Sequence, residues 1–142
     1  HYPSPDAQRC IACRKGHYSG QHDLMCRPCG PGHFSSSEGE ASCSACSAGD
    51  FATGLASISC QPCPPGSFSR GAAGRCQSCQ PGSYAISSGS GSCQECAPGT
   101  FNPHSRGTKC LMCPLGQVAV RSGARDCAEC PTGTIPLNSS PL

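Results

Sequence analysis

The spacing of the cysteines is the feature that most constrains what this chain can fold into. All 16 cysteines of the 142 residues stand in C-x-x-C pairs, each of which we call a knuckle. The first cysteines of successive knuckles are 16 or 17 residues apart, so the chain is built on a short and nearly strict repeat. The eight knuckles are Cys10/Cys13, Cys26/Cys29, Cys43/Cys46, Cys60/Cys63, Cys76/Cys79, Cys93/Cys96, Cys110/Cys113 and Cys127/Cys130.

A glycine keeps the same period, three residues after the second cysteine of each knuckle. Prolines such as Pro65 and Pro98 precede several of these glycines, as at the central positions of a type II turn. We therefore expect a turn after every knuckle, with positive φ or a close backbone approach at the glycine. The turn glycines are Gly16, Gly32, Gly49, Gly66, Gly82, Gly99, Gly116 and Gly133.

An apolar residue, usually aromatic, follows two positions after each glycine. The chain has no Trp and few other large apolar residues, so the nearby cystine is the apolar group available for contact. We expect the residues at this position to stack along a narrow spine between the cystines. The predicted spine is Tyr18, Phe34, Phe51, Phe68, Tyr84, Phe101, Val118 and Ile135.

The composition excludes an ordinary packed core and favours a disulfide scaffold. The chain holds 18 Gly and 14 Pro beside its 16 Cys, which is the composition of a small secreted disulfide-rich protein. No window shows sustained helical spacing of apolar residues. The predicted fold is small and disulfide-rich, an elongated linear array of short β-hairpin repeats with little regular secondary structure over residues 1–142. This cysteine usage implies an oxidising compartment, so we expect an extracellular or cell-surface location.

The array is expected to begin and end inside a repeat. His1-Tyr2 stands in the register of His17-Tyr18, and Gly133 and Ile135 have no knuckle after them. The partners we expect are neighbouring copies of the chain or further repeats of the same array.

The cysteine spacing also suits a zinc site, so the two interpretations must be weighed. C-x2-C-x12/13-C-x2-C provides four thiolates for a tetrahedral ion. Eight consecutive knuckles and a secretory composition favour structural cystines instead. We expect no metal and no cofactor.

Two schemes for pairing the cysteines into disulfides are open. A crossed scheme joins neighbouring knuckles, as Cys10–Cys26 with Cys13–Cys29, and doubles the period. The sequential scheme joins each second cysteine to the next first cysteine, and we favour it because no doubled period is visible. It leaves Cys10 and Cys130 with partners outside the segment and gives Cys13–Cys26, Cys29–Cys43, Cys46–Cys60, Cys63–Cys76, Cys79–Cys93, Cys96–Cys110 and Cys113–Cys127.

Three segments, CPPGSFS, CQPGSYAISSGSGSCQEC and CAPGTFN, resemble ephrin-receptor-like cysteine-rich repeats. They are also similar to the first submodule of tumour-necrosis-factor-receptor cysteine-rich domains. That resemblance implies a loop closed by one disulfide, here Cys63–Cys76, in agreement with the sequential scheme. Such repeats occur in receptors, matrix proteins, and the surface and flagellar-hair proteins of protists and algae.

The remaining features point away from catalysis and nucleic acid. No paired carboxylates or Ser/His/Asp arrangement recur with the repeat, so we expect no enzyme. A net charge of +2 with 13% charged residues does not suit nucleic acid, and no apolar run suggests membrane insertion. Asn138-Ser139-Ser140 is a candidate N-glycosylation site, with glycans as possible partners.

Repetition without a unique site leads to the functional hypothesis. We expect a structural extracellular protein, a disulfide-laddered rod that serves as spacer, stalk or fibre subunit. The alternative is a receptor or adhesion ectodomain that binds a protein ligand, with Leu111-Met112 as the candidate contact. A zinc-binding module is the third hypothesis.

Overall fold

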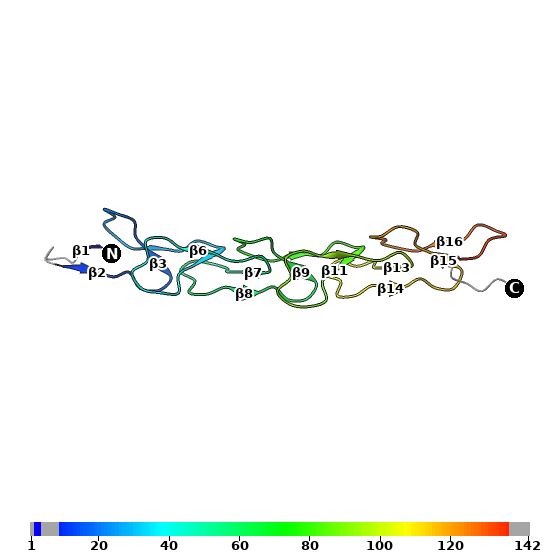
Figure 1. Cartoon of the computed structure of the whole chain (residues 1–142), viewed down its shortest axis with the longest axis horizontal. Coiled ribbons are helices and arrows are strands. Elements are labelled where there is room, and N and C mark those ends of the chain that lie inside the picture. The colour runs from blue at the N-terminus through cyan, green and yellow to red at the C-terminus, as the bar shows by residue number, and fades with distance from the viewer. Residues whose placement is uncertain (1, 4–8, 137–142) are drawn as a thin grey trace.

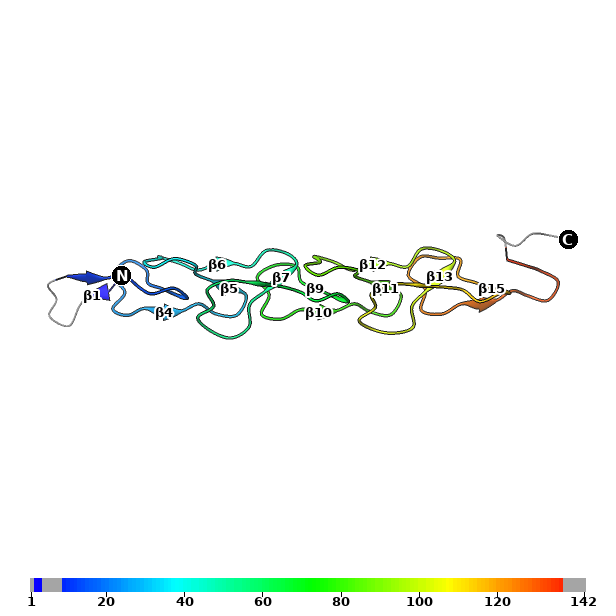
Figure 2. The same cartoon turned by 90° about the horizontal axis from the view of Figure 1, so that it is seen from below.

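The chain forms an elongated rod. The computed structural model describes residues 2–3 and 9–136, and Figures 1 and 2 show the repeats following one another along a single axis. The molecule exposes 9433 Å² to solvent. A compact protein of this mass exposes only about 6,800 Å². The predicted class, a disulfide-rich array of hairpins, is confirmed, and the described residues contain no helix.

Eight two-stranded antiparallel sheets make up the regular structure of the described residues. The first strand of each hairpin carries the residue at the spine position, and every strand is two residues long. These odd-numbered strands are β1 (Tyr2–Pro3), β3 (His17–Tyr18), β5 (His33–Phe34), β7 (Asp50–Phe51), β9 (Ser67–Phe68), β11 (Ser83–Tyr84), β13 (Thr100–Phe101) and β15 (Gln117–Val118).

The second strand of each hairpin falls inside a knuckle, usually on the two residues between its cysteines. Figure 2 shows β4, β6, β10 and β12 at the edges of the rod, with β5, β7, β11 and β13 along its middle. The even-numbered strands are β2 (Cys10–Ile11), β4 (Arg27–Pro28), β6 (Ser44–Ala45), β8 (Gln61–Pro62), β10 (Gln77–Ser78), β12 (Gln94–Glu95), β14 (Leu111–Met112) and β16 (Ala128–Glu129).

A tight turn leads from each knuckle into the next odd-numbered strand. In the turn before β9, the Ser67 N–H donates to the Pro64 carbonyl over 3.2 Å, and Gly66 has φ 85°. The Gly66 carbonyl then accepts the Cys79 N–H over 2.9 Å, which closes the hairpin. All eight periodic glycines have φ between 81° and 93°, a region that side-chain-bearing residues rarely adopt.

Seven disulfides staple the hairpins, and they follow the sequential scheme. The crossed scheme is therefore wrong, and so is the zinc interpretation for these fourteen cysteines. Cys10 and Cys130 have no disulfide partner. The bonds are Cys13–Cys26, Cys29–Cys43, Cys46–Cys60, Cys63–Cys76, Cys79–Cys93, Cys96–Cys110 and Cys113–Cys127.

The buried axis of the rod is made by small residues rather than aromatics. Six second cysteines, from Cys13 to Cys96, are 0–3% exposed. The residue after each spine position is buried as well: Ser19, Ser35, Ala52, Ser69, Ala85, Asn102 and Ala119. The aromatics predicted to form the spine are only half-buried, from Tyr18 and Phe34 through Phe51, Phe68 and Tyr84 to Phe101, as is Val118. Their stacking between the cystines stays a prediction, and the contacts that join one module to the next are made by the backbone.

Candidate functional site

The surface that recurs along this molecule is the junction between successive disulfide loops. We number these loops as modules 1 to 7, from Cys13–Cys26 to Cys113–Cys127 in chain order. Each junction is built from backbone groups, so its geometry does not depend on the varied side chains of the repeats. The six junctions from module 1 to module 7 share the same three hydrogen bonds.

Two of the three bonds involve the small buried residue after the spine position. The turn glycine donates its N–H to the carbonyl of the small residue in the next module, as Gly66 does to Ala85 over 2.9 Å. The small residue in turn donates its own N–H into the next module's loop, as Ser69 does to the Ser90 carbonyl over 3.2 Å. Because both of its backbone polar groups are bonded, this position can be buried without an unsatisfied donor or acceptor.

The third bond returns in the opposite direction. A residue in the loop of one module donates its N–H to the carbonyl of the second cysteine in the preceding module, as Gly89 does to Cys63 over 2.8 Å. We call these donors the loop residues, and all of them have positive φ. They are Gly39, Ala56, Ala72, Gly89, Arg106 and Gly123.

The loop residue also contacts the module two places before its own. The carbonyl of Arg106 in module 6 lies directly over Gly66 in module 4, where an added Cβ would collide with it. The same contact pairs Gly16 with Ala56, Gly32 with Ala72, Gly49 with Gly89, and Gly82 with Gly123. Glycine is thus required at these five turns twice over, for its positive φ and for the close approach of another backbone.

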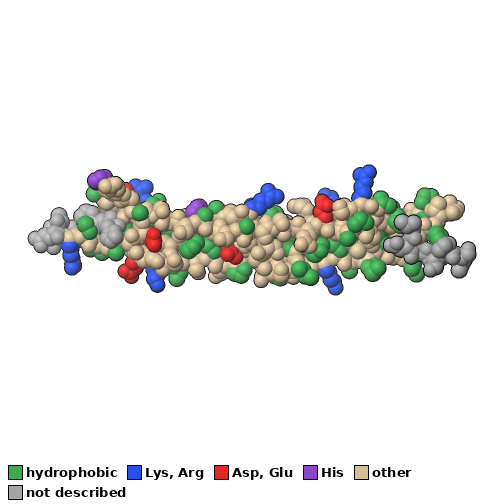
Figure 3. All heavy atoms as spheres, viewed as in Figure 1, with side chains coloured by type: hydrophobic (Ala, Val, Ile, Leu, Met, Phe, Trp, Pro, Cys, Tyr) green, Lys and Arg blue, Asp and Glu red, His purple; other side chains and the backbone are tan. Residues whose placement is uncertain are grey.

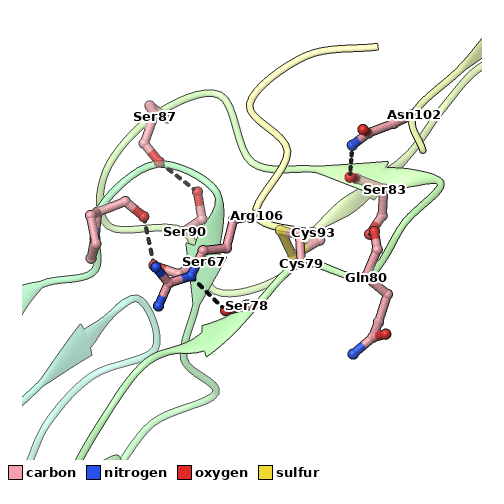
Figure 4. Close-up of a disulfide and its surroundings, with 11 residues drawn as sticks. Ser67, Ser78, Cys79, Gln80, Ser83, Ser87, Ser90, Cys93, Asn102 and Arg106 are labelled. Atoms are coloured by element: carbon pink, nitrogen blue, oxygen red, sulfur yellow. Dashed lines mark hydrogen bonds between the residues drawn. A yellow bond between two sulfur atoms is a disulfide. The ribbon is translucent and has the colours of Figure 1, made fainter. Parts of the chain in front are cut away.

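Polar side chains strengthen some junctions. The buried Ser69 hydroxyl donates to the Asp50 carbonyl over 2.6 Å and accepts the Gly49 N–H over 3.1 Å. Around the Cys79–Cys93 disulfide, the Asn102 amide donates to the Ser83 carbonyl over 2.9 Å (Figure 4). These bonds join one module to the next, since in each case the donor and acceptor come from adjacent loops.

The last two modules differ from the first five. For Gly99 and Gly116, no described atom lies within 4 Å of the position that a Cβ would take. Gly116 is exposed, whereas the five turn glycines from Gly16 to Gly82 are buried. A groove of about 380 Å³ with apolar walls opens here, lined among others by Met112, Leu115 and Val120. Leu115 is 100% exposed and Met112 is 83% exposed.

The structure does not gather the other polar candidates into a site. His17 and His33 each place Nδ1 3.2 Å from a backbone carbonyl in their own turn. Among the described residues no group of three or more His, Cys, Asp or Glu could hold a metal ion. Charged side chains of both signs are scattered along the visible face of the rod (Figure 3). Asn138, the glycosylation candidate, lies outside the described residues.

Sequence reasoning missed the small residue after the spine position and the loop residues. The small residues had a visible signal, because Ser, Ala or Asn stands after every spine position from Tyr18 to Val118. The loop residues had almost no signal in the sequence, since Gly, Ala and Arg all occupy that position.

The family comparison agrees with this geometry. Residues 66–108 match the family model described as tyrosine-protein kinase ephrin type A/B receptor-like. The matched segment is similar to an ephrin-receptor-like cysteine-rich domain. It runs from the turn of module 4 into the loop of module 6, so it contains all three hydrogen bonds of the junction between modules 5 and 6. No curated protein matches the chain.

The likeness of residues 66–108 to a receptor-like domain and the ladder of disulfides fit an extracellular or cell-surface location. In the described part of the chain, no helix is long and apolar enough to cross a membrane.

Proposed function

We propose that this chain is a structural extracellular rod that holds other groups apart, as a spacer, stalk or fibre subunit. The observation that carries the proposal is the uniform junction, in which the same three backbone hydrogen bonds recur at six successive places. A chain built from such junctions has a length fixed by its number of modules and little freedom to bend between them. The disulfides strengthen each module by constraining its unfolded state.

The surface of the rod supports a mechanical role. Catalytic and ligand sites are usually concave and lined by convergent polar groups. Here the side chains that differ between repeats include those of the even-numbered strands, most of which are exposed. Rigidity and length are the properties that every module contributes equally. We therefore propose that the chain is not an enzyme and that its outer face is solvated.

Removing one module tests this function. Deletion of residues 63–78 joins Pro62 to Cys79 and so preserves a knuckle of the same form, Cys60-Gln61-Pro62-Cys79. Small-angle scattering of the intact chain should give a radius of gyration at least about 1.5 times the 14–15 Å of a compact protein of this length. The deletion should shorten the maximum dimension by one module's advance while the cross-section stays constant.

An exchange of sequence that keeps the number of modules is the matched control. Replacing residues 63–78 with the sequence of residues 46–62 retains a complete module between two knuckles. The scattering curve should then match that of the intact chain. A compact radius of gyration for the intact chain, or a deletion that leaves the maximum dimension unchanged, would refute the spacer function.

A second candidate function is a receptor or adhesion ectodomain. It is favoured by the match of residues 66–108 to a receptor-like family and by the exposure of Leu111 and Met112, at 47% and 83%. Under this proposal a protein ligand contacts β14, and Met112→Glu weakens binding of the chain to ligand-bearing cells while Ile86→Glu does not. Equal binding by the two variants would exclude β14 as the contact.

A further inference from the structure

We propose that the disulfides carry tension past the loops that they close, so that the oxidised rod has a fixed maximum length and reduction lengthens it in defined steps. This inference rests on the proposed spacer function and deepens it, because it states how the rod responds when the groups that it holds apart are pulled. It depends on the pairing of cysteines within the array, which is the same in every module.

The covalent path along the rod alternates between disulfides and knuckles. Force that enters module 4 at Cys63 leaves it at Cys76, because the disulfide joins these two residues directly. The force then passes along β10 to Cys79 and into the next disulfide, Cys79–Cys93 (Figure 4). Residues 64–75, which include β9, lie outside this path. We call the route through the disulfides the disulfide bypass, and each hairpin has one strand on it and one strand off it.

The disulfide bypass is much shorter than the chain. The Cα atoms of Cys63 and Cys76 are 5.8 Å apart, and the extended knuckle from Cys76 to Cys79 adds about 11 Å. The longest covalent path through one oxidised repeat is therefore about 17 Å. A repeat of 16 or 17 residues without its disulfide extends to about 60 Å. Opening one disulfide thus adds about 40 Å to the length that the chain can reach.

Contacts between modules resist the first part of a pull. Each junction has its three backbone hydrogen bonds, and the Arg106 carbonyl over Gly66 adds a contact across two modules. Breaking these contacts lets the chain straighten, but only to the limit that the disulfides set. The loops stay closed meanwhile, so the groups of each junction remain near one another. The junctions re-form when the tension falls, because only short segments must be brought together again.

The disulfides are accessible to a reductant from one side. In modules 2 to 6 the second cysteine is 0–3% exposed, whereas the first cysteine of the following knuckle is half-buried. A thiolate therefore attacks the sulfur of Cys76 and forms a mixed disulfide there, while the electron pair of the broken bond leaves on Cys63. A second thiolate attacks the mixed disulfide and releases Cys76. Two reducing thiols become one disulfide, and their two protons end on Cys63 and Cys76.

Single-molecule force spectroscopy tests the fixed maximum length. The 142-residue chain is held between two handle domains, with Cys10→Ser and Cys130→Ser to remove the free thiols. Without a reductant, we expect no lengthening step of about 40 Å at any force below rupture of the tether. With dithiothreitol, each reduction under load should add one step of about 40 Å of contour length, because a closed loop joins the path.

Two variants of module 4 test the route of the force without a reductant. Cys63→Ala/Cys76→Ala removes the disulfide bypass from this module, so the oxidised chain should show one step of about 40 Å. Gly66→Ala is the matched control. It weakens the same module by collision with the Arg106 carbonyl but keeps the disulfide, so it should show no such step. If peptide mapping finds mispaired disulfides in either variant, the comparison with and without dithiothreitol decides.

A short pulse of reduced glutathione identifies the sulfur that is attacked. An alkylating reagent then blocks the released thiols, and peptide mapping locates both labels. We expect glutathione on first cysteines such as Cys76 and the alkyl group on second cysteines such as Cys63, since the second cysteines are buried in the junctions. Glutathione found mainly on the second cysteines would overturn this route of reduction.

The outcomes separate this proposal from the proposed function. An intact oxidised chain that lengthens in steps of about 40 Å overturns the disulfide bypass, and so does a correctly paired Cys63→Ala/Cys76→Ala variant that gives no step. In both cases an elongated scattering profile of the intact chain leaves the spacer function standing. A compact radius of gyration refutes the spacer function instead, whereas steps that occur only on reduction still support the bypass.

Discussion

Modules 4 and 7 have nearly the same local structure but different surroundings. Each is closed by one disulfide, with sequence separations of 13 and 14 residues, and each turn has its glycine at positive φ. Gly66 in module 4 is buried beneath a carbonyl from module 6, while Gly116 in module 7 is exposed. The comparison shows that a repeat's local fold and its burial come from different sources. The knuckle and turn produce the local fold, and the two following modules produce the burial.

This difference makes stability a property of position along the rod. A module near the middle is contacted by neighbours on both sides, one and two modules away. In a quasi-one-dimensional array the free energy of unfolding is roughly a sum of module terms and interface terms. Module 4 therefore has more interface to lose than module 7, even though their covalent cross-links close loops of nearly equal length.

The largest expected effect is the loss of a central disulfide. Cys63→Ala/Cys76→Ala should lower the free energy of unfolding by about 3 kcal/mol through the cross-link, and further through the buried contacts around Cys63. Cys113→Ala/Cys127→Ala removes an equivalent cross-link with less of the interface. Urea unfolding followed by circular dichroism should place the midpoint of the central variant lower.

Limited proteolysis with mass spectrometry distinguishes the two variants by location. We expect cleavage inside module 4 to separate the central variant into two folded halves, whereas cleavage in the other variant should be confined to the last modules. Identical midpoints and identical cleavage maps would show that the interfaces add nothing to the disulfides.

Glycine substitution is expected to have the second-largest effect. Gly66→Ala meets both the strain of φ 85° and a collision with the Arg106 carbonyl, so it should cost more than about 3 kcal/mol. Gly116→Ala meets the strain alone, at φ 81°, and should cost about 1–2 kcal/mol. Thermal unfolding of the monomers at low concentration measures the difference.

Gly71→Ala provides the control for position within module 4. Gly71 has φ 113°, but its Cβ would stand 3.5 Å from the Cys46 carbonyl oxygen, an ordinary contact. Its cost should resemble that of Gly116→Ala rather than that of Gly66→Ala. If Gly66→Ala and Gly71→Ala destabilise equally, the close approach of the Arg106 loop does not explain the glycine at position 66.

The sequence was sufficient to predict the local fold. Cysteine spacing indicated hairpins joined in a linear array, and the invariant glycine with its preceding proline indicated the turn that closes at Pro64 and Ser67. These features are local because the disulfide and the turn both lie within one period. The period allowed the sequential and crossed disulfide schemes to be ranked, but it did not decide between them.

The sequence was not sufficient to predict how modules contact one another. Phe68 was expected inside a spine, yet the buried residue is its neighbour Ser69, which is 2% exposed. Hydrophobicity favoured the ring, while the junction requires a small residue with both backbone groups bonded. The contact of Arg106 with Gly66 joins backbone to backbone, so the identity of Arg106 carries no signal of it.

The smallest effect concerns the loop residue that covers the turn glycine of module 1. Ala56 has φ 63°, where a Cβ costs about 1–2 kcal/mol, and its carbonyl lies over Gly16. Ala56→Gly relieves this strain but gives the unfolded chain more freedom, which offsets about 0.4–1 kcal/mol. The net expectation is a gain of about 0.5–1 kcal/mol in the free energy of unfolding, with the contact to Gly16 preserved. Ala48→Gly is the matched control. Ala48 does not have positive φ, so its replacement by glycine should only destabilise the protein. Urea midpoints should therefore move in opposite directions for the two variants. If both fall, the backbone at Ala56 is not strained in solution, and the contact of its carbonyl with Gly16 forms without backbone strain.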